Sequence, residues 1–255
     1  MTPGSKAALL ALCLASPVSW AQRELDADLA ILDQARLVAA GERVAIHQRG
    51  VAVEPAFLQL AEAAYRRLDS LTGRGATVAA LGPKIHIYVS DMRAASHVWR
   101  AYDHPSDPKA IVFLNRRAYE GAIRGDNATY AHEMAHLFTW RYSSHSLREG
   151  LADFLALQIH PGAAVGPNPA GFESEPVPVE VTPYLGTRLP PPPQVSSDEH
   201  FRQGYYAASY RFVKFLVARA GMQTFLKLYD SADPEAEYAG LYGASRQELV
   251  REAVR

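Results

Sequence analysis

The pattern of apolar and polar positions changes near the middle of the chain, and the change predicts two kinds of structure. In the front half, residues 43–49 and 83–90 alternate apolar with polar side chains, and residues 109–115 form a short apolar run. Such stretches are typical of β-strands. Residues 24–40 and 54–71 instead repeat apolar side chains at the spacing of an α-helix. We therefore expect strands and helices to be mixed in the front half.

The back half has helical spacing almost throughout. It is interrupted by one long segment, residues 161–197, which is rich in proline and glycine and contains the run LPPPP. Such a segment is either a stiff surface connection or part of a cleft wall. The helices are expected over residues 126–142, 147–159, 196–221, 221–229 and 245–254.

Residues that favour helix ends mark several of these boundaries. Gly41 and Gly221 directly follow helical patterns, where glycine commonly ends a helix. Pro55 lies in the first turn of its helix, a position that proline favours. Capping boxes are expected for the pairs Ser196 with Glu199 and Ser245 with Glu248. Asp126 or Asn127 is the expected N-cap of the helix over residues 126–142.

Together these patterns predict an α+β fold in which a mixed lobe with a small sheet precedes a helical lobe. The mixed lobe covers residues 42–142 and the helical lobe covers residues 143–255. Residues 22–41 come before both lobes as an N-terminal helix. The helix over residues 126–142 is expected at the junction of the two lobes.

The first 21 residues are typical of a cleavable secretory signal. Lys6 precedes an apolar run over residues 7–18, and a Ser-Trp-Ala tripeptide ending at Ala21 provides the pattern that signal peptidase recognises. We expect cleavage after Ala21 and a periplasmic or secreted protein; the alternative is a retained N-terminal helix. The run is shorter than the about 20 residues that span a bilayer, and no later stretch comes closer. No membrane span is therefore expected in the mature chain.

Composition limits the chemistry further. Cys13 is the only cysteine and lies inside the predicted signal, so the mature chain would have no thiol. That excludes a disulfide-stapled scaffold and a cysteine-ligated zinc site, and it leaves His, Asp and Glu as ligands for any metal. Lys and Arg number 26 against 27 Asp and Glu, with no basic stripe. We therefore expect no nucleic-acid partner.

One short stretch, YAHEMAHLFTW, places two histidines and a glutamate in an apolar helix. His132 and His136 are four residues apart, so their rings project from one face and can reach the same ion. Glu133 is placed to contact a water on that ion rather than to bind the ion itself. The alternatives are a chance motif or a structural pair of histidines in the core.

A catalytic zinc also requires a third protein ligand and an open position. Thr139 and Tyr142 stand where one known scheme requires a glycine and a third histidine, so that scheme fails. The next helix, SLREGLADFLA, offers Glu149, and Asp153 shares its face four residues later. We expect Glu149 to bind the metal and Asp153 to accept the free ring N–H of a histidine ligand. His145 is the rival third ligand, and a solvated helix edge is the alternative for the two carboxylates.

The motifs HEMAH and EGLADFLA together resemble the gluzincin metallopeptidases, most closely the bacterial peptidase MA-like domain proteins. The segment YYAASYRFVKFLVARAG resembles the C-terminal helix of that family. The chain departs from the family pattern in two places: only twelve residues separate His136 from Glu149, and Ser146 replaces a common tryptophan. The resemblance implies a zincin-like domain over residues 42–255. It also implies Zn²⁺ bound by His132, His136 and Glu149, with Glu133 as general base and Asp153 behind the ligands.

The resemblance further implies hydrolysis of peptide bonds in a peptide or protein substrate. Glu133 would take the proton of the attacking water and pass it to the leaving amine. Gluzincins often place a tyrosine of the C-terminal lobe beside the metal, where it donates to the oxyanion. Tyr205 and Tyr206 are the candidates for that tyrosine, and the alternative is that both only pack. Residues 109–115 are either an edge strand that pairs with an extended peptide or an ordinary strand.

Two functions therefore follow from the sequence: a secreted or periplasmic zinc metallopeptidase, and a zinc-binding, catalytically silent module with a binding or envelope role. The presence of Glu133 favours the enzyme, because a silent module has no physical need of a base beside its metal.

Overall fold

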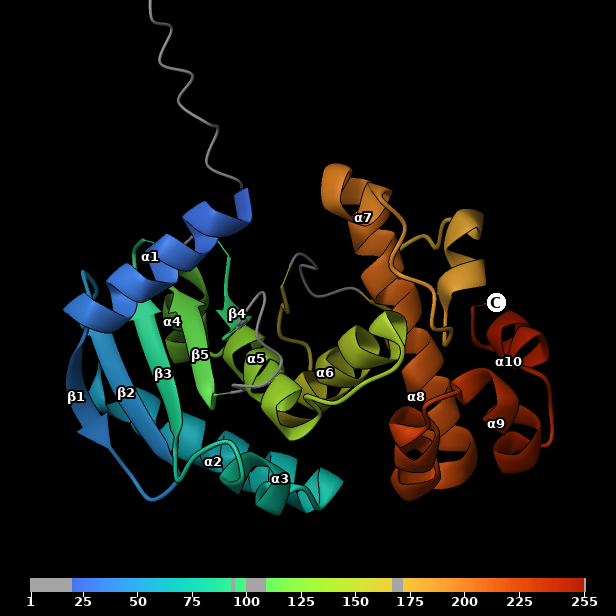
Figure 1. Ribbon diagram of the computed structural model, residues 1–255, viewed down its shortest axis with the longest axis horizontal. Helices are drawn as coiled ribbons and strands as arrows, with labels where there is room; N and C mark the ends of the chain where they lie inside the picture. The colour runs from blue at the N-terminus through green and yellow to red at the C-terminus, as the bar shows by residue number, and fades with distance from the viewer. Residues whose placement is uncertain (1–19, 93–94, 100–108, 167–171, 255) are drawn as a thin grey trace, which may run out of the picture.

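A five-stranded sheet forms one side of the protein and a group of helices forms the other (Figure 1). This computed structural model describes residues 20–92, 95–99, 109–166 and 172–254. The strands are β1 (Arg36–Ala40), β2 (Val44–Arg49), β3 (Ile85–Ser90), β4 (His97–Val98) and β5 (Ile111–Asn115), in the sheet order β1-β2-β3-β5-β4. The three inner strands are parallel, and each edge strand is antiparallel to its neighbour. The α+β class is confirmed, but β5 is not an edge strand because β4 pairs with it.

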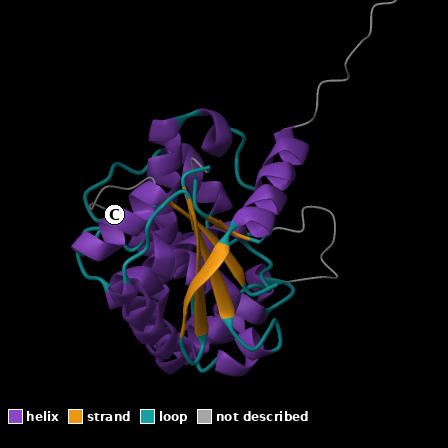
Figure 2. Ribbon diagram, turned by 90° about the vertical axis from the view of Figure 1, so that its left-hand side faces the viewer, coloured by secondary structure: helices purple, strands orange, loops and turns teal. Residues whose placement is uncertain are grey.

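Alternation along the inner strands explains why helices cover both faces of the sheet. Ile85, Ile87 and Val89 of β3 are buried on one face, whereas His86 and Tyr88 are half-buried on the other. The helices α2 (Pro55–Thr72) and α4 (Arg116–Arg124) pack on the face that carries Ile85, Ile87 and Val89, and α3 (Gly75–Ala79) follows α2. The helix α1 (Trp20–Gln34) lies across the opposite face (Figure 2).

The helical lobe begins at the junction with the sheet. Two helices, α5 (Thr129–Phe138) and α6 (His145–Ile159), lie side by side there. The remaining elements are η1 (Val179–Tyr184), α7 (Gln194–Ser197), α8 (Glu199–Asp230), α9 (Pro234–Tyr242) and α10 (Arg246–Ala253). Gly221 interrupts α8 with a left-handed φ of 81°, which confirms the predicted helix end. The Ser245–Glu248 capping box is also present.

The helix expected over residues 24–40 is only partly correct. α1 ends at Gln34, and the chain continues as β1, with Gly41 in the turn that leads to β2 rather than at a helix end. The apolar residues of this short segment fit either a helix or a strand. Antiparallel pairing of β1 with β2 supplies the backbone hydrogen bonds that decide between them.

Two predicted N-caps are wrong. The residue before α5 is Ala128, although the side chain of Asn127 does accept a hydrogen bond from the backbone N–H of Thr129. For α8 the cap is Asp198 rather than Ser196, because Ser196 already lies in α7. At α8 the side chain of Asp198 accepts from the backbone N–H of Phe201 and so takes the role expected of Ser196.

The predicted signal peptide lies outside the described residues, apart from its last two positions, Trp20 and Ala21. Within the part of the chain that the structure describes, no helix combines the length and the apolar character that a membrane span requires.

The crossing of α6 over α8 depends on a glycine. A Cβ at Gly150 would overlap the backbone carbonyl of Ser209 on α8. The two backbones therefore approach more closely than any other residue type would allow. Gly204 has a similar role nearer the start of α8, where a Cβ would overlap the ring of Pro178 from the long loop. The contact at Gly150 fixes the helix that carries Glu149 against α8, and the contact at Gly204 fixes the loop against α8.

We predict that Gly150→Ala lowers the free energy of unfolding by about 1–3 kcal/mol, because the added methyl group must push α6 away from α8. Urea denaturation followed by circular dichroism measures the change. Gly240→Ala is the matched control: that exposed glycine of α9 has no atom within 4 Å of an added Cβ. The control should be neutral or slightly stabilising. Equal stability of the two variants would contradict the close crossing.

Candidate metal centre

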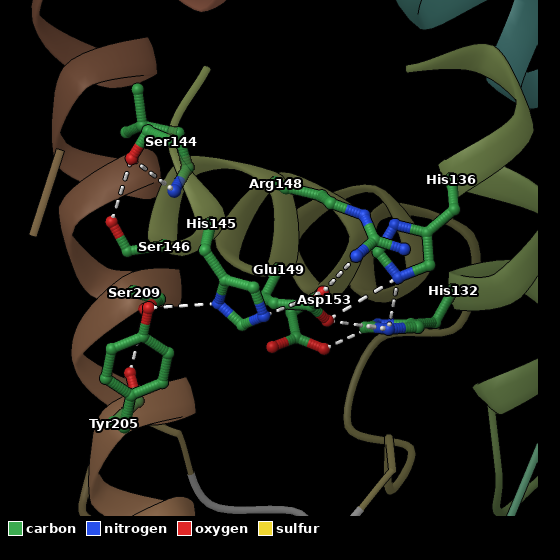
Figure 3. A network of polar contacts seen from close by, with 11 residues as sticks. His132, His136, Ser144, His145, Ser146, Arg148, Glu149, Asp153, Tyr205 and Ser209 are labelled. Carbon is green, nitrogen blue, oxygen red and sulfur yellow. Dashed lines mark hydrogen bonds and ion pairs between the residues drawn. The ribbon is translucent and has the colours of Figure 1, made fainter. Parts of the chain in front are cut away.

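The geometry of the centre starts from two buried helices. Every residue of α5 from Thr129 to Phe138 is buried, so the rings of His132 and His136 cannot turn out to solvent. Ser144 begins α6 by accepting a hydrogen bond from the backbone N–H of Leu147. α6 then packs beside α5 and directs Glu149 and Asp153 towards the two rings (Figure 3).

Three atoms from these helices converge on one point. His132 Nε2 lies 3.0 Å from His136 Nε2, and each of these nitrogens lies 3.5 Å from Glu149 Oε2. Ligand atoms of a tetrahedral zinc, with bonds of about 2.0–2.1 Å, lie about 3.3 Å from one another. The spacing therefore fits three ligands of a single ion. Ligand atoms of His132, Glu133 and His136 also lie within 4.8 Å of one another, so Glu133 borders the same space.

The carboxylate of Asp153 fixes the orientation of the first imidazole. His132 Nδ1 lies 2.7 Å from Asp153 Oδ1, and both side chains are buried. Burial raises the pKa of Asp153 to about 6, so at neutral pH it is mostly ionised and can only accept. His132 must then donate from Nδ1, which directs Nε2 towards His136 and Glu149. His136 Nδ1, in contrast, has no hydrogen-bond partner among the described residues.

The protonation states of the three predicted ligand side chains are compatible with metal binding. Burial, reinforced by Arg148, lowers the pKa of His136 to about 3, so that its ring is neutral, the form that binds metals. Burial alone would raise the pKa of Glu149, but His136 and Arg148 hold it well below its ordinary value. Burial also opposes protonation of His132, yet Asp153 raises its pKa well above the usual range. A cation at Nε2 would replace that proton.

Carboxylates predominate among the charged groups that are buried around the centre. Glu133, Glu149 and Asp153 are carboxylates with exposures of 7%, 4% and 1%, and the one guanidinium among them, Arg148, is 8% exposed. Without a metal, the proton that Asp153 holds on His132 adds a further positive charge, and a divalent cation at Nε2 would take the place of that proton. The cluster of buried carboxylates around two imidazoles therefore supports a metal site.

The centre opens onto a cleft of about 780 Å³ between the two lobes. His132, Glu133, His136 and Glu149 all line it, whereas Asp153 and Arg148 do not. The sheet lobe contributes polar residues to one wall, and the first turns of α8 form part of another. Besides the centre itself, the polar lining includes Ser96, Asn127, Thr129, Glu199, Gln203 and Tyr206. No residue of α1 lines this cleft, so the described part of the N-terminal segment does not cover it.

The structure separates the two candidate tyrosines. Tyr206 lies in the cleft wall with the predicted ligands. Tyr205 is buried, and its hydroxyl lies 3.0 Å from His145 Nδ1 (Figure 3). His145, the rival third ligand, points its Nε2 at the far oxygen of Glu149, 3.8 Å away, and it does not line the cleft. The geometry therefore favours Glu149 over His145 and Tyr206 over Tyr205.

Two polar residues of α6, Ser146 and Arg148, have structural roles that were not predicted from the sequence. Ser146 accepts from the backbone N–H of Gly186 and donates to the carbonyl of Tyr184, so it fastens the long loop to α6. Arg148 lies against Glu149. The only signal in the sequence was adjacency to the predicted ligand, and residues next to each other on a helix normally face apart.

Comparisons with known proteins add nothing to this geometry, because no protein-family model and no curated protein matches the sequence.

We predict that Asp153→Asn weakens zinc binding by about ten- to a hundredfold, the usual cost of losing a carboxylate behind a histidine ligand. Competition with a fluorescent chelator measures the affinity, and circular dichroism checks the fold. Asp230→Asn is the control, because Asp230 forms an ion pair with Arg74 away from the centre. Unchanged affinity in Asp153→Asn would mean that Asp153 does not act on the metal.

Proposed function

We propose that this chain is a zinc-dependent metallopeptidase of the gluzincin type, with a zincin-like fold, and that it acts in the periplasm or outside the cell. One observation carries the proposal: His132 Nε2, His136 Nε2 and Glu149 Oε2 converge within 3.5 Å of one another beside Glu133, at the floor of an open cleft. Three protein ligands with an open side are the arrangement of catalytic rather than structural zinc.

The residues divide the chemistry among them. When bound, zinc would polarise the scissile carbonyl and lower the pKa of water. Glu133 accepts the proton of the attacking water and delivers it to the nitrogen of the leaving amine. Tyr206 donates its hydroxyl proton as a hydrogen bond to the oxygen that becomes negative. The cleft between the lobes accommodates the peptide on both sides of the bond that is cut.

The alternative function is a zinc-binding module without activity. It would require the same three ligands but no base. The carboxylate of Glu133 lies beside the ligands and faces the cleft, and it favours the enzyme because a silent module has no physical need of a base there.

A combined metal and activity assay tests the proposal. Elemental analysis should find one zinc per chain in the purified protein and much less in Glu149→Ala. Glu133→Gln should keep its zinc but lose peptide hydrolysis by about 10²–10⁴-fold, because it lacks the base. Glu120→Gln, an exposed substitution on α4 away from the cleft, is the control. If Glu133→Gln cleaves a peptide library as fast as the parent, the mechanism is wrong. Zinc without any cleavage in the parent would favour the silent module.

The two tyrosines give a separate test of the oxyanion donor. We expect Tyr206→Phe to lower kcat by about 10²–10³-fold with little change in KM, since the lost hydrogen bond forms mainly in the transition state. Tyr205→Phe should affect kcat much less, because the hydroxyl of Tyr205 is engaged with His145. Steady-state kinetics on one peptide measures both variants. The opposite order of effects would assign the role to Tyr205.

A further inference from the structure

The two oxygens of Glu149 face different partners. Oε2 lies 3.5 Å from the ring nitrogens of both His132 and His136. Oε1 points the other way, 3.2 Å from Arg148 Nη1 and 3.8 Å from His145 Nε2 (Figure 3). One oxygen therefore lies on the side of the proposed metal, and the other lies on the side of a cation supplied by the same helix.

Arg148 is an unusual partner, because it comes directly before Glu149 on α6. Adjacent helical residues project about 100° apart and seldom meet. The side chain of Arg148 nevertheless stays buried and reaches Glu149, while the ring of Tyr142 lies over its guanidinium, 4.8 Å from the ring centroid. Stacking on one side and the carboxylate on the other leave the guanidinium little freedom to turn away.

The coordination of the carboxylate depends on this contact. A glutamate can bind a metal through one oxygen or through both, and an unrestrained carboxylate can switch between the two modes. A catalytic zinc with two histidines and one glutamate requires an open position for water. A second carboxylate oxygen on the metal would occupy that position. An ion pair between a guanidinium and Oε1 keeps that oxygen away from the metal.

We propose that Arg148 is the positioning residue of the third ligand: it holds Oε1 of Glu149, so that only Oε2 is offered to the metal and one position stays open for water. This inference rests on the proposed zinc centre. It therefore sets how Glu149 binds, and an oriented carboxylate holds a divalent ion more tightly than one that must first be ordered.

Substitution of Arg148 tests the role. In Arg148→Met the stem remains but the charge is lost, and we expect zinc affinity to fall about ten- to a hundredfold. Arg148→Lys keeps a charge that can reach Oε1 and should recover most of the affinity. With cobalt in place of zinc, the visible spectrum should change from a four-coordinate form in the parent towards a five-coordinate form in Arg148→Met, because Oε1 joins the metal. A merely structural role would not change the coordination number.

Arg74→Met is the matched control. Arg74 also combines an ion pair, with Asp230, and an aromatic contact, with Tyr229, and its side chain is 15% exposed. Arg74 directly precedes α3, pairs with Asp230 rather than with a predicted ligand, and does not line the cleft. Its loss should leave both the zinc affinity and the cobalt spectrum as in the parent.

The outcomes separate this inference from the proposed function. If the parent binds zinc and Arg148→Met has the same affinity and cobalt spectrum, Arg148 has no positioning role, while the zinc centre stands. If the parent binds no zinc, both proposals fail. If Arg148→Met does not fold, the crystal structure of the zinc-loaded parent still tests the role of Arg148. A crystal structure with one oxygen of Glu149 on zinc and the other on Arg148 supports the inference, and one with both oxygens on zinc overturns it.

Discussion

Burial of charge between α5 and α6 is the constraint on which the rest of the structure depends. The carboxylates of Glu133, Glu149 and Asp153 lie within a few ångströms of two imidazoles, in a region almost closed to water. A site of this kind is stable only if every charge has a partner, since buried ions lose their hydration. Arg148, the histidines and a divalent cation together would satisfy that requirement.

The helical lobe holds these groups in place. Gly150, next to Glu149, lets α6 lie directly on the backbone of α8. Ser146 on the same helix ties down the long loop through Gly186. Arg211 of α8 fastens an earlier part of that loop by donating to three of its backbone carbonyls. The Pro-rich segment is thus part of the framework around the centre and not a free connection, and ligands on a rigid framework keep their geometry.

Function depends on the side of the centre that faces the cleft. The predicted ligands and Glu133 lie on its floor, whereas the groups that orient them, Asp153 and Arg148, lie behind. This separation lets a substrate approach the open side without disturbing the hydrogen bonds that fix the ligands. The proposed peptidase activity, the choice of Tyr206 and the role of Arg148 all follow from this one arrangement.

The sequence by itself determined which side chains share a helix face: His132 with His136, and Glu149 with Asp153. It also determined the end of the long helix at Gly221, because periodicity and end residues act within a few positions of the chain. Only the tertiary structure decided that residues 36–40 form a strand and that Tyr206, not Tyr205, lines the cleft. It alone brought Arg148 onto the far oxygen of Glu149. These outcomes depend on contacts between segments distant in sequence, or on side-chain directions set by packing, which local patterns do not contain.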